Sequence, residues 1–290
     1  RAGRRWGGRA VWGHPGRGAI GQVAVVIARS RGGSGLVEPL PIAAMVSDIR
    51  EVVYVNYLVE AERVRGMVPE GLELQGLGDG GRWALFSFLT YRHGHFGFRF
   101  MGSLRRLTPS SVQTNWRVHV RDARTGVVGI TFVTNAIDHT FQALAARLFT
   151  EGMPMHVLAR AALDRDATTG SVHVELDPGE GTAPRATLDL RPCDAPVFEG
   201  EWAECFKDFR AFLEYCVPQN RAMSAEPWLA RVTRHEIHLP IALEDCQPLA
   251  GEVRSLTAEA ITGGARPVCF RVAGLRFVFE EEIHDPLPID

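Results

Sequence analysis

The chain has 290 residues, of which 46% are hydrophobic and 23% charged, a composition typical of a globular protein with a sizeable core. Its formal net charge is −2, so no excess of positive charge indicates binding to nucleic acid or to an anionic membrane surface. We therefore expect a small-molecule partner, with no nucleic acid and no membrane. The five cysteines show no C-x-x-C spacing, and reduced thiols in a cytoplasmic protein are the simplest interpretation.

The first 44 residues differ from the rest of the chain. They open with "RAGRRWGGRAVWGHPGRG", which is rich in Arg and Gly and contains no acidic residue, and continue into the short apolar run "AIGQVAVVIA". We interpret residues 1–44 as a disordered or artefactual leader, with an export signal as the alternative. Residues 45–290 are then expected to form a single domain.

Strand patterns dominate from residue 47 onward. Strands are expected at 50–59, 82–91, 113–122 and 126–137, with a short helix ended by Pro69 after the first of them. A helix is expected at 138–152, with Asp138 as N-cap, Gly152 as C-cap and Phe141, Leu144, Ala145 and Leu148 as its buried stripe. A second helix is expected at 201–216, among further strands, with Phe206, Phe209, Leu213 and Cys216 as its buried stripe. This order predicts an α+β fold in which a large antiparallel sheet closes into a cone or barrel with two principal helices.

The strand "QTNWRVHVRD" (113–122) poses the main functional question. Alternation places Gln113, Asn115, Arg117, His119 and Arg121 on one face, which is entirely polar. Such a face turns either to water or into a pocket, and the pattern alone leaves both possibilities open.

Other chemistry-bearing residues give weaker signals. "TRHEIHLP" has H-E-x-H spacing, which on a strand points His235 away from Glu236 and His238, so surface residues are a simpler interpretation than a metal site. His93 and His95 are flanked by glycines and are expected in a loop. Lys207 is the sole lysine and lies on the polar face of its predicted helix. No phosphate-binding glycine loop or dinucleotide fingerprint is present, and we expect neither a cofactor nor a metal.

The order of these elements resembles a known superfamily. The run "REVVYVNYLVEAERVRGMVPEGLEL", the Trp83 strand, "NWRVHVRDARTGVVGITFV" and the helix ending in "GMPMHVLA" resemble the acetoacetate decarboxylase-like superfamily, and in particular the bacterial YqjF-like proteins. The resemblance implies a single domain, a closed antiparallel sheet with an internal ligand cavity, and homo-oligomerisation.

The resemblance also indicates what the site has lost. Met155 occupies the position of the lysine that forms an imine in acetoacetate decarboxylases, His156 that of its amine neighbour, and Gln113 that of a glutamate. Arg50 matches an arginine that persists and is suited to holding a carboxylate. Decarboxylation through an imine is therefore not expected here.

Two functions remain open on this scaffold. The first is an enzyme that transforms a small organic acid or carbonyl compound without an imine, with His156 and His119 moving protons. The second is a non-catalytic ligand-binding or assembly domain. In either case the expected ligand contacts are Arg50, Gln113, Asn115, Arg117, Met155 and Trp83, with aromatic walls that include Phe86, Phe88 and Trp116.

Overall fold

The computed structural model describes residues 45–149, 153–217, 220–226 and 231–286, which belong to one compact unit, Leu40–Asp290. The expected leader and the expected C-cap Gly152 lie outside the described residues. The principal strands are β1 (Met45–Glu60), β3 (Trp83–Arg92), β5 (Val112–Asp122), β6 (Val128–Ile137), β8 (Arg160–Arg165), β9 (Val172–Asp177), β10 (Ala186–Pro192), β11 (Arg221–Glu226), β12 (Arg231–His238), β13 (Gln247–Arg254) and β14 (Val268–Pro286). Shorter strands are β2 (Leu72–Leu74), β4 (Gly97–Phe98) and β7 (Met155–Val157).

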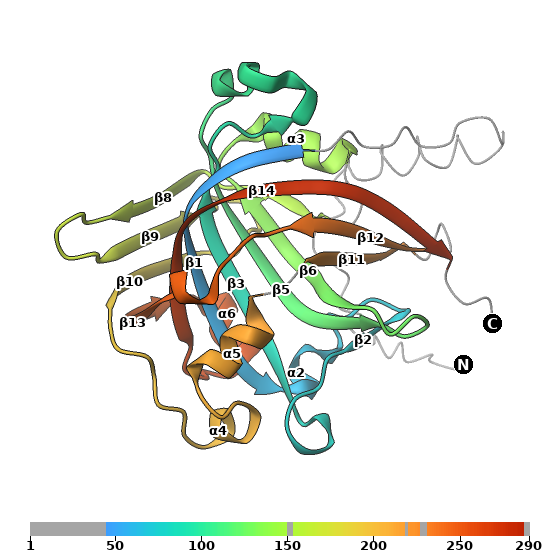
Figure 1. Cartoon of the computed structure of the whole chain (residues 1–290), viewed down its shortest axis with the longest axis vertical. Coiled ribbons are helices and arrows are strands. Elements are labelled where there is room, and N and C mark those ends of the chain that lie inside the picture. Colours follow the sequence, from blue (N-terminus) through green and yellow to red (C-terminus); the bar gives the residue numbers. More distant parts are fainter. Residues whose placement is uncertain (1–44, 150–152, 218–219, 227–230, 287–290) are drawn as a thin grey trace, which may run out of the picture. The chain divides into compact units, whose positions relative to one another are not determined.

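Helices are few and short in the described part of the chain. They are α2 (Ala61–Arg65), α3 (Thr140–Phe149), α4 (Glu201–Cys205), α5 (Phe209–Cys216) and α6 (Leu256–Thr262), with 3-10 turns η1 (Asp79–Gly81), η2 (Arg99–Leu107) and η4 (Leu243–Asp245). None of the described helices is long and apolar enough to cross a membrane. The expected α+β class with a dominant sheet is confirmed (Figure 1).

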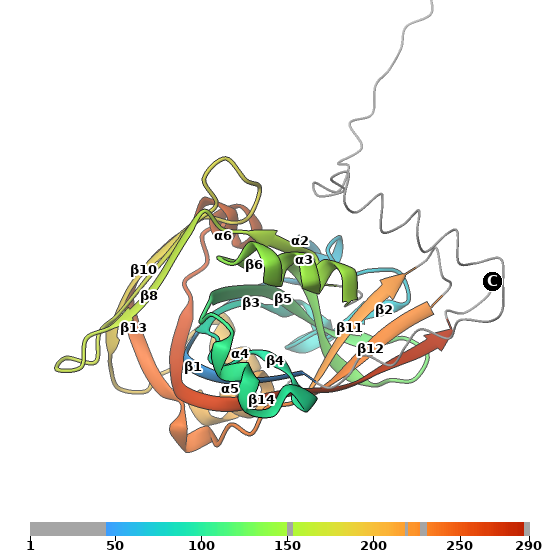
Figure 2. The same ribbon diagram turned by 90° about the horizontal axis from the view of Figure 1, so that it is seen from above.

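Seven strands close into a ring. The sheet runs β1-β3-β5-β6-β11-β12-β14, and β14 pairs again with β1 along Met45–Asn56 (Figure 2). Two pairings in this sheet are parallel rather than antiparallel as expected: β6 with β11, and β6 with β7. Between β6 and β7 the polypeptide passes through α3, and this crossover lets the two strands run in the same direction.

A second layer covers the outer face of β1, β3 and β5. Strands β13, β10, β9 and β8 continue the sheet from β14, and their apolar side chains share one core with the outward residues of the ring. Trp116 and Phe88 stack in this core with ring centroids 4.3 Å apart, and both are fully buried. The strands β3 and β5 are therefore covered on both faces, which explains the nearly continuous burial along their length.

The two expected helices differ in detail from the structure. The segment 201–216 forms two helices, because Asp208 interrupts it and caps α5 by accepting a hydrogen bond from the Ala211 amide at 2.8 Å. The expected buried residues Phe206, Phe209, Leu213 and Cys216 are buried.

Helix α3 differs from the prediction in its N-cap and in part of its buried face. His139, not Asp138, accepts from the third amide of the turn, that of Gln142, whereas the Asp138 carboxylate accepts from the Val112 amide. Phe141 is 79% exposed and Leu144 is also exposed, so these two residues of the expected stripe do not face the core. Ala145, which was expected in the stripe, lines the cavity together with Ala146, and Ala143 is buried. The side chain of Leu148 lies outside the described residues.

Candidate functional site

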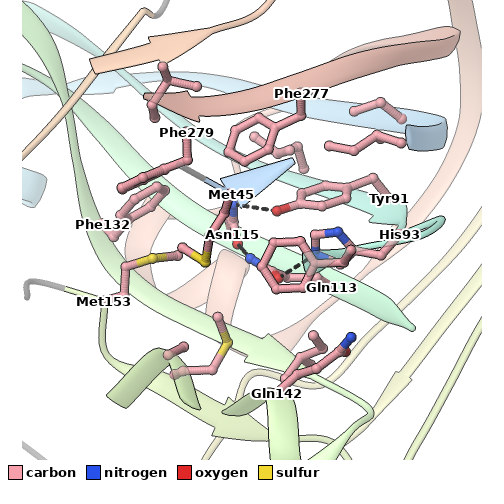
Figure 3. A pocket seen from close by; sticks show the side chains of 18 of the residues that line it. Met45, Tyr91, His93, Gln113, Asn115, Phe132, Gln142, Met153, Phe277 and Phe279 are labelled. Atoms are coloured by element: carbon pink, nitrogen blue, oxygen red, sulfur yellow. Dashed lines mark hydrogen bonds between the residues drawn. The ribbon is translucent and has the colours of Figure 1, made fainter. Parts of the chain in front are cut away.

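A cavity of about 130 Å³ lies inside the ring of strands. Side chains of β1, β3, β5, β6, β12 and β14 line it, together with α3 and the residues before β7 (Figure 3). This volume is several times the roughly 10–15 Å³ that a single buried water needs, so the cavity has room for several waters or for a small organic molecule. Ligand sites are mostly apolar cavities with a few polar groups, and this cavity has that character, so we take it as the candidate site.

The alternation of β5 decides which of its residues reach the cavity. Gln113, Asn115 and Arg117 point into the ring, whereas Trp116 and its even-numbered neighbours enter the outer core. The first three residues of the polar face therefore line a pocket, whereas His119 and Arg121 do not. The expected aromatic walls Phe86, Phe88 and Trp116 belong instead to the outer core, because they occupy the opposite parity on their strands.

A chain of hydrogen bonds runs along one wall of the cavity. His93 Nε2 lies 2.8 Å from Gln113 Oε1, Gln113 Nε2 donates to Asn115 Oδ1 at 2.7 Å, and Asn115 Nδ2 donates to the Tyr91 hydroxyl at 3.2 Å (Figure 3). The far ring nitrogen of His93, Nδ1, lies 2.8 Å from the Ser47 hydroxyl. Each side-chain amide thus uses both its oxygen and its nitrogen within the chain.

The donors and acceptors in this series of hydrogen bonds follow from the chemistry of its members. Gln113 Oε1 can only accept, so His93 carries its proton on Nε2, and Nδ1 accepts from Ser47. Burial lowers the pKa of His93 to about 4, so the ring is neutral at physiological pH. At the other end the Tyr91 oxygen accepts from Asn115, which leaves the Tyr91 hydroxyl proton for a group inside the cavity.

Arg117 is the charged group of the cavity. Its side chain is buried, its Nε donates to the Ser87 hydroxyl at 3.2 Å, and its guanidinium lies 5.6 Å from the centre of the Tyr54 ring. Within the described residues no acidic side chain forms an ion pair with it. Burial raises the pKa of Tyr54 to about 12 and also raises that of Tyr91, and in each case Arg117 opposes part of the shift. Both phenols therefore remain protonated donors near the guanidinium.

Four of the expected site residues line the cavity: Gln113, Asn115, Arg117 and Met155. The structure brings these four together from β5 and β7. Met155 is buried and its strand lies beside β6, pairing in register with Asn135.

The two remaining expected binding residues lie elsewhere. Arg50 is exposed at a β-bulge, where Glu51 takes a φ of 48° and interrupts the alternation of β1. Trp83 donates from Nε1 to Glu204 at 3.0 Å. It shares a face with Tyr91 but begins the strand, and eight residues at about 3.3 Å each separate the two by roughly 26 Å.

The two expected proton-transfer residues also lie outside the cavity lining. His119 is fully buried beyond Arg117 and stacks on Tyr215 with centroids 4.9 Å apart, and burial with the Arg117 charge holds its pKa well below the usual range. His156 is half-buried, its Nδ1 lies 3.3 Å from the Thr182 hydroxyl, and burial lowers its pKa. It neighbours Met155, so alternation turns it away from the cavity.

Several lining residues were not anticipated from the sequence. Tyr91 lies on the same face of β3 as Leu89, and His93 continues this parity just past the end of the strand. Extending the alternation two residues beyond the predicted strand 82–91 would have found His93. The aromatic residues Phe132, Phe277 and Phe279 come from strands β6 and β14, and no local pattern indicates that their rings converge on β5.

The described residues offer little for metal or imine chemistry. In this part of the chain no group of three or more His, Cys, Asp or Glu side chains is placed to hold a metal ion. Lys207, the sole lysine of the sequence, is exposed as predicted, although it lies between α4 and α5 rather than within a helix. The cavity therefore contains no primary amine from a lysine side chain.

Comparisons with known proteins agree with this architecture. The model of the DUF2071 family, described as an uncharacterized conserved protein, matches residues 47–239. No protein of curated function matches the chain in sequence. The enduracididine biosynthesis enzyme MppR complexed with pyruvate is a similar structure, with a TM-score of 0.55 and 14% identity over 88% of this chain and 93% of that one.

Two further solved structures share the fold. One is acetoacetate decarboxylase from Legionella pneumophila subsp. pneumophila str. Philadelphia 1, with a TM-score of 0.56 and 12% identity over 89% of this chain and 95% of that one. Another is an acetoacetate decarboxylase-like enzyme from Sphingomonas wittichii RW1, with a TM-score of 0.57 and 9% identity over 89% of this chain and 100% of that one. The expected acetoacetate decarboxylase-like fold is thereby confirmed.

Proposed function

The chain belongs to the DUF2071 family, and from this premise we propose that its internal cavity binds a small organic acid without forming a covalent bond to it. Similar folds hold small ligands in related structures, since one is complexed with pyruvate and another has HEPES buffer bound. The proposal rests on one observation above all: Arg117 is buried at the cavity without an acidic partner among the described residues.

A buried charge without a partner is costly, because a guanidinium loses its hydration on burial and regains it only through an anion and hydrogen bonds. A ligand carboxylate would supply that anion, and a guanidinium can hold it through two parallel N–H···O bonds. The Tyr91 hydroxyl, which accepts from Asn115, has its proton available as a further donor to the same carboxylate.

Covalent and proton-transfer chemistry have less support. Met155 stands where the resemblance places the imine lysine, and Lys207 is exposed. His93 lines the cavity, but both of its ring nitrogens have hydrogen-bond partners and its pKa of about 4 makes it a weak base at neutral pH. These features favour a binding protein over an enzyme that relies on histidine.

Isothermal titration calorimetry with propionate and with the uncharged propionamide tests this proposal. Arg117→Met should weaken propionate binding by about tenfold to a hundredfold, since hydrogen bonds to a charged group contribute about 1.5–3 kcal/mol. The matched control is Arg121→Met, which removes an exposed arginine from the same strand and should leave binding unchanged. Equal binding of propionate and propionamide, or equal binding by both variants, would contradict the proposal.

A further inference from the structure

Given the proposed carboxylate site at Arg117, on which this inference rests, we propose that the ligand is a monocarboxylic acid with an aromatic tail. Among the described residues that line the cavity, Arg117 is the single charged group, and a separate wall is aromatic. The ligand chemistry that fits both is one anionic head joined to one apolar ring.

The polar wall is largely occupied by its own hydrogen bonds. The amides of Gln113 and Asn115 bond to each other and to His93 and Tyr91, and the oxygen of Gln142 accepts from the Ser111 hydroxyl. A ligand rich in hydroxyl or carboxyl groups would have to break these bonds or leave its own polar groups unpaired. A ligand with one carboxylate needs only Arg117 and the free proton of Tyr91.

The opposite wall is apolar and aromatic. Phe277 and Phe279 of β14 lie with ring centroids 6.3 Å apart, and Phe132 of β6 and Met153 complete this side (Figure 3). In Figure 3, Phe132, Phe279 and Met153 lie on the side of the view opposite Tyr91 and His93, and Phe277 lies between the two sides. Aromatic rings and methionine sulfur both pack favourably on a further aromatic ring.

The size of the cavity agrees with such a ligand. Its volume of about 130 Å³ is several times the roughly 10–15 Å³ that a single buried water needs, which leaves room for a small organic acid with a ring. A second carboxylate in place of the ring would face Phe132 and its neighbours and lose its hydration without gaining a partner. The site should therefore discriminate against dicarboxylates.

Calorimetric titration of the full chain with propionate, 3-phenylpropionate and glutarate tests the inference. We expect 3-phenylpropionate to bind at least about tenfold more tightly than propionate, because each buried methylene-sized group contributes about fourfold in affinity. Glutarate should bind no more tightly than propionate.

Substitutions in the aromatic wall separate the contribution of the ligand's ring to binding from that of its carboxylate. Phe132→Ala, with Phe132→Leu as a milder change, should weaken binding of 3-phenylpropionate more than binding of propionate, and so reduce the preference for the aromatic acid. Leu256→Ala removes an apolar side chain exposed on α6 and should preserve the full preference.

The outcomes distinguish this inference from the proposed function. If both acids bind with equal affinity and depend on Arg117, or if glutarate binds more tightly than 3-phenylpropionate, the aromatic-tail inference is wrong and the carboxylate site stands. If neither acid binds, or if Arg117→Met binds both as the wild type does, the proposed function itself fails.

Discussion

The buried imidazole of His93 should make the stability of this protein depend on pH. In the folded state its pKa is about 4, whereas an unfolded chain has the ordinary histidine value of about 6.5. Between these two values the unfolded state binds a proton that the folded state does not. Stability should therefore fall as the pH decreases from about 6.5 to 4, and rise again with increasing pH.

The magnitude follows from the separation of the two pKa values. Proton linkage at His93 should lower the free energy of unfolding by about 2 kcal/mol between pH 7 and pH 5, and by about 3 kcal/mol below pH 4. His119 contributes in the same direction, because its pKa is also lowered by burial. A comparison of wild type with His93→Gln isolates the His93 part, since glutamine keeps polar atoms at the site but does not titrate.

Urea denaturation at pH 7 and pH 5 measures this difference. On acidification, His93→Gln should lose about 2 kcal/mol less than the wild type. The control is Ser47→Ala, which removes the hydrogen-bond partner of His93 Nδ1 but keeps the titrating ring, and should retain most of the wild-type pH dependence. Parallel stability curves for His93→Gln and wild type would refute the reasoning.

Three further changes test the charge and packing. Arg117→Met should raise the free energy of unfolding by about 1–3 kcal/mol, because it removes a buried charge that forms no ion pair within the described residues; a less stable variant would contradict this. Trp116→Ala should lower the free energy of unfolding by about 3–5 kcal/mol, measured by urea denaturation, since the ring is fully buried between the two layers. Gly251→Ala should cost about 1–3 kcal/mol, because the new methyl would lie 2.1 Å from the Asp189 carbonyl oxygen. Gly66→Ala is its near-neutral control, since nothing lies within 4 Å of that methyl; equal thermal stability of the two glycine variants would refute the packing argument.

Local patterns were sufficient for much of the architecture. Strand positions and the polar face of residues 113–119 followed from alternation, and the order of elements indicated the acetoacetate decarboxylase-like fold that the solved structures confirm. The prediction of which residues around α5 are buried was likewise correct. The roles assigned to individual site residues, the homo-oligomeric state and the cytoplasmic location remain predictions.

Other features could not be read from local pattern. The predicted buried face of α3 was wrong at Phe141 and Leu144, because apolar side chains in a sequence pattern give no sign of being exposed. Small alanines approach the sheet and the cavity. The bulge at Arg50 and Glu51 breaks the parity of β1, so counting along the strand misplaces Arg50. His93 lies just beyond a strand, where alternation is not normally extended.

The sequence by itself determined which side chains share a face, because the two-residue period of a strand is a local property of the backbone. It also determined that only Lys207 could supply a lysine amine. Only the tertiary structure decided which face is enclosed, since this depends on β14 pairing with β1 across more than 200 residues of chain. That long-range closure brings Arg117, the bonded chain from His93 to Tyr91 and the phenylalanines of β6 and β14 around one cavity.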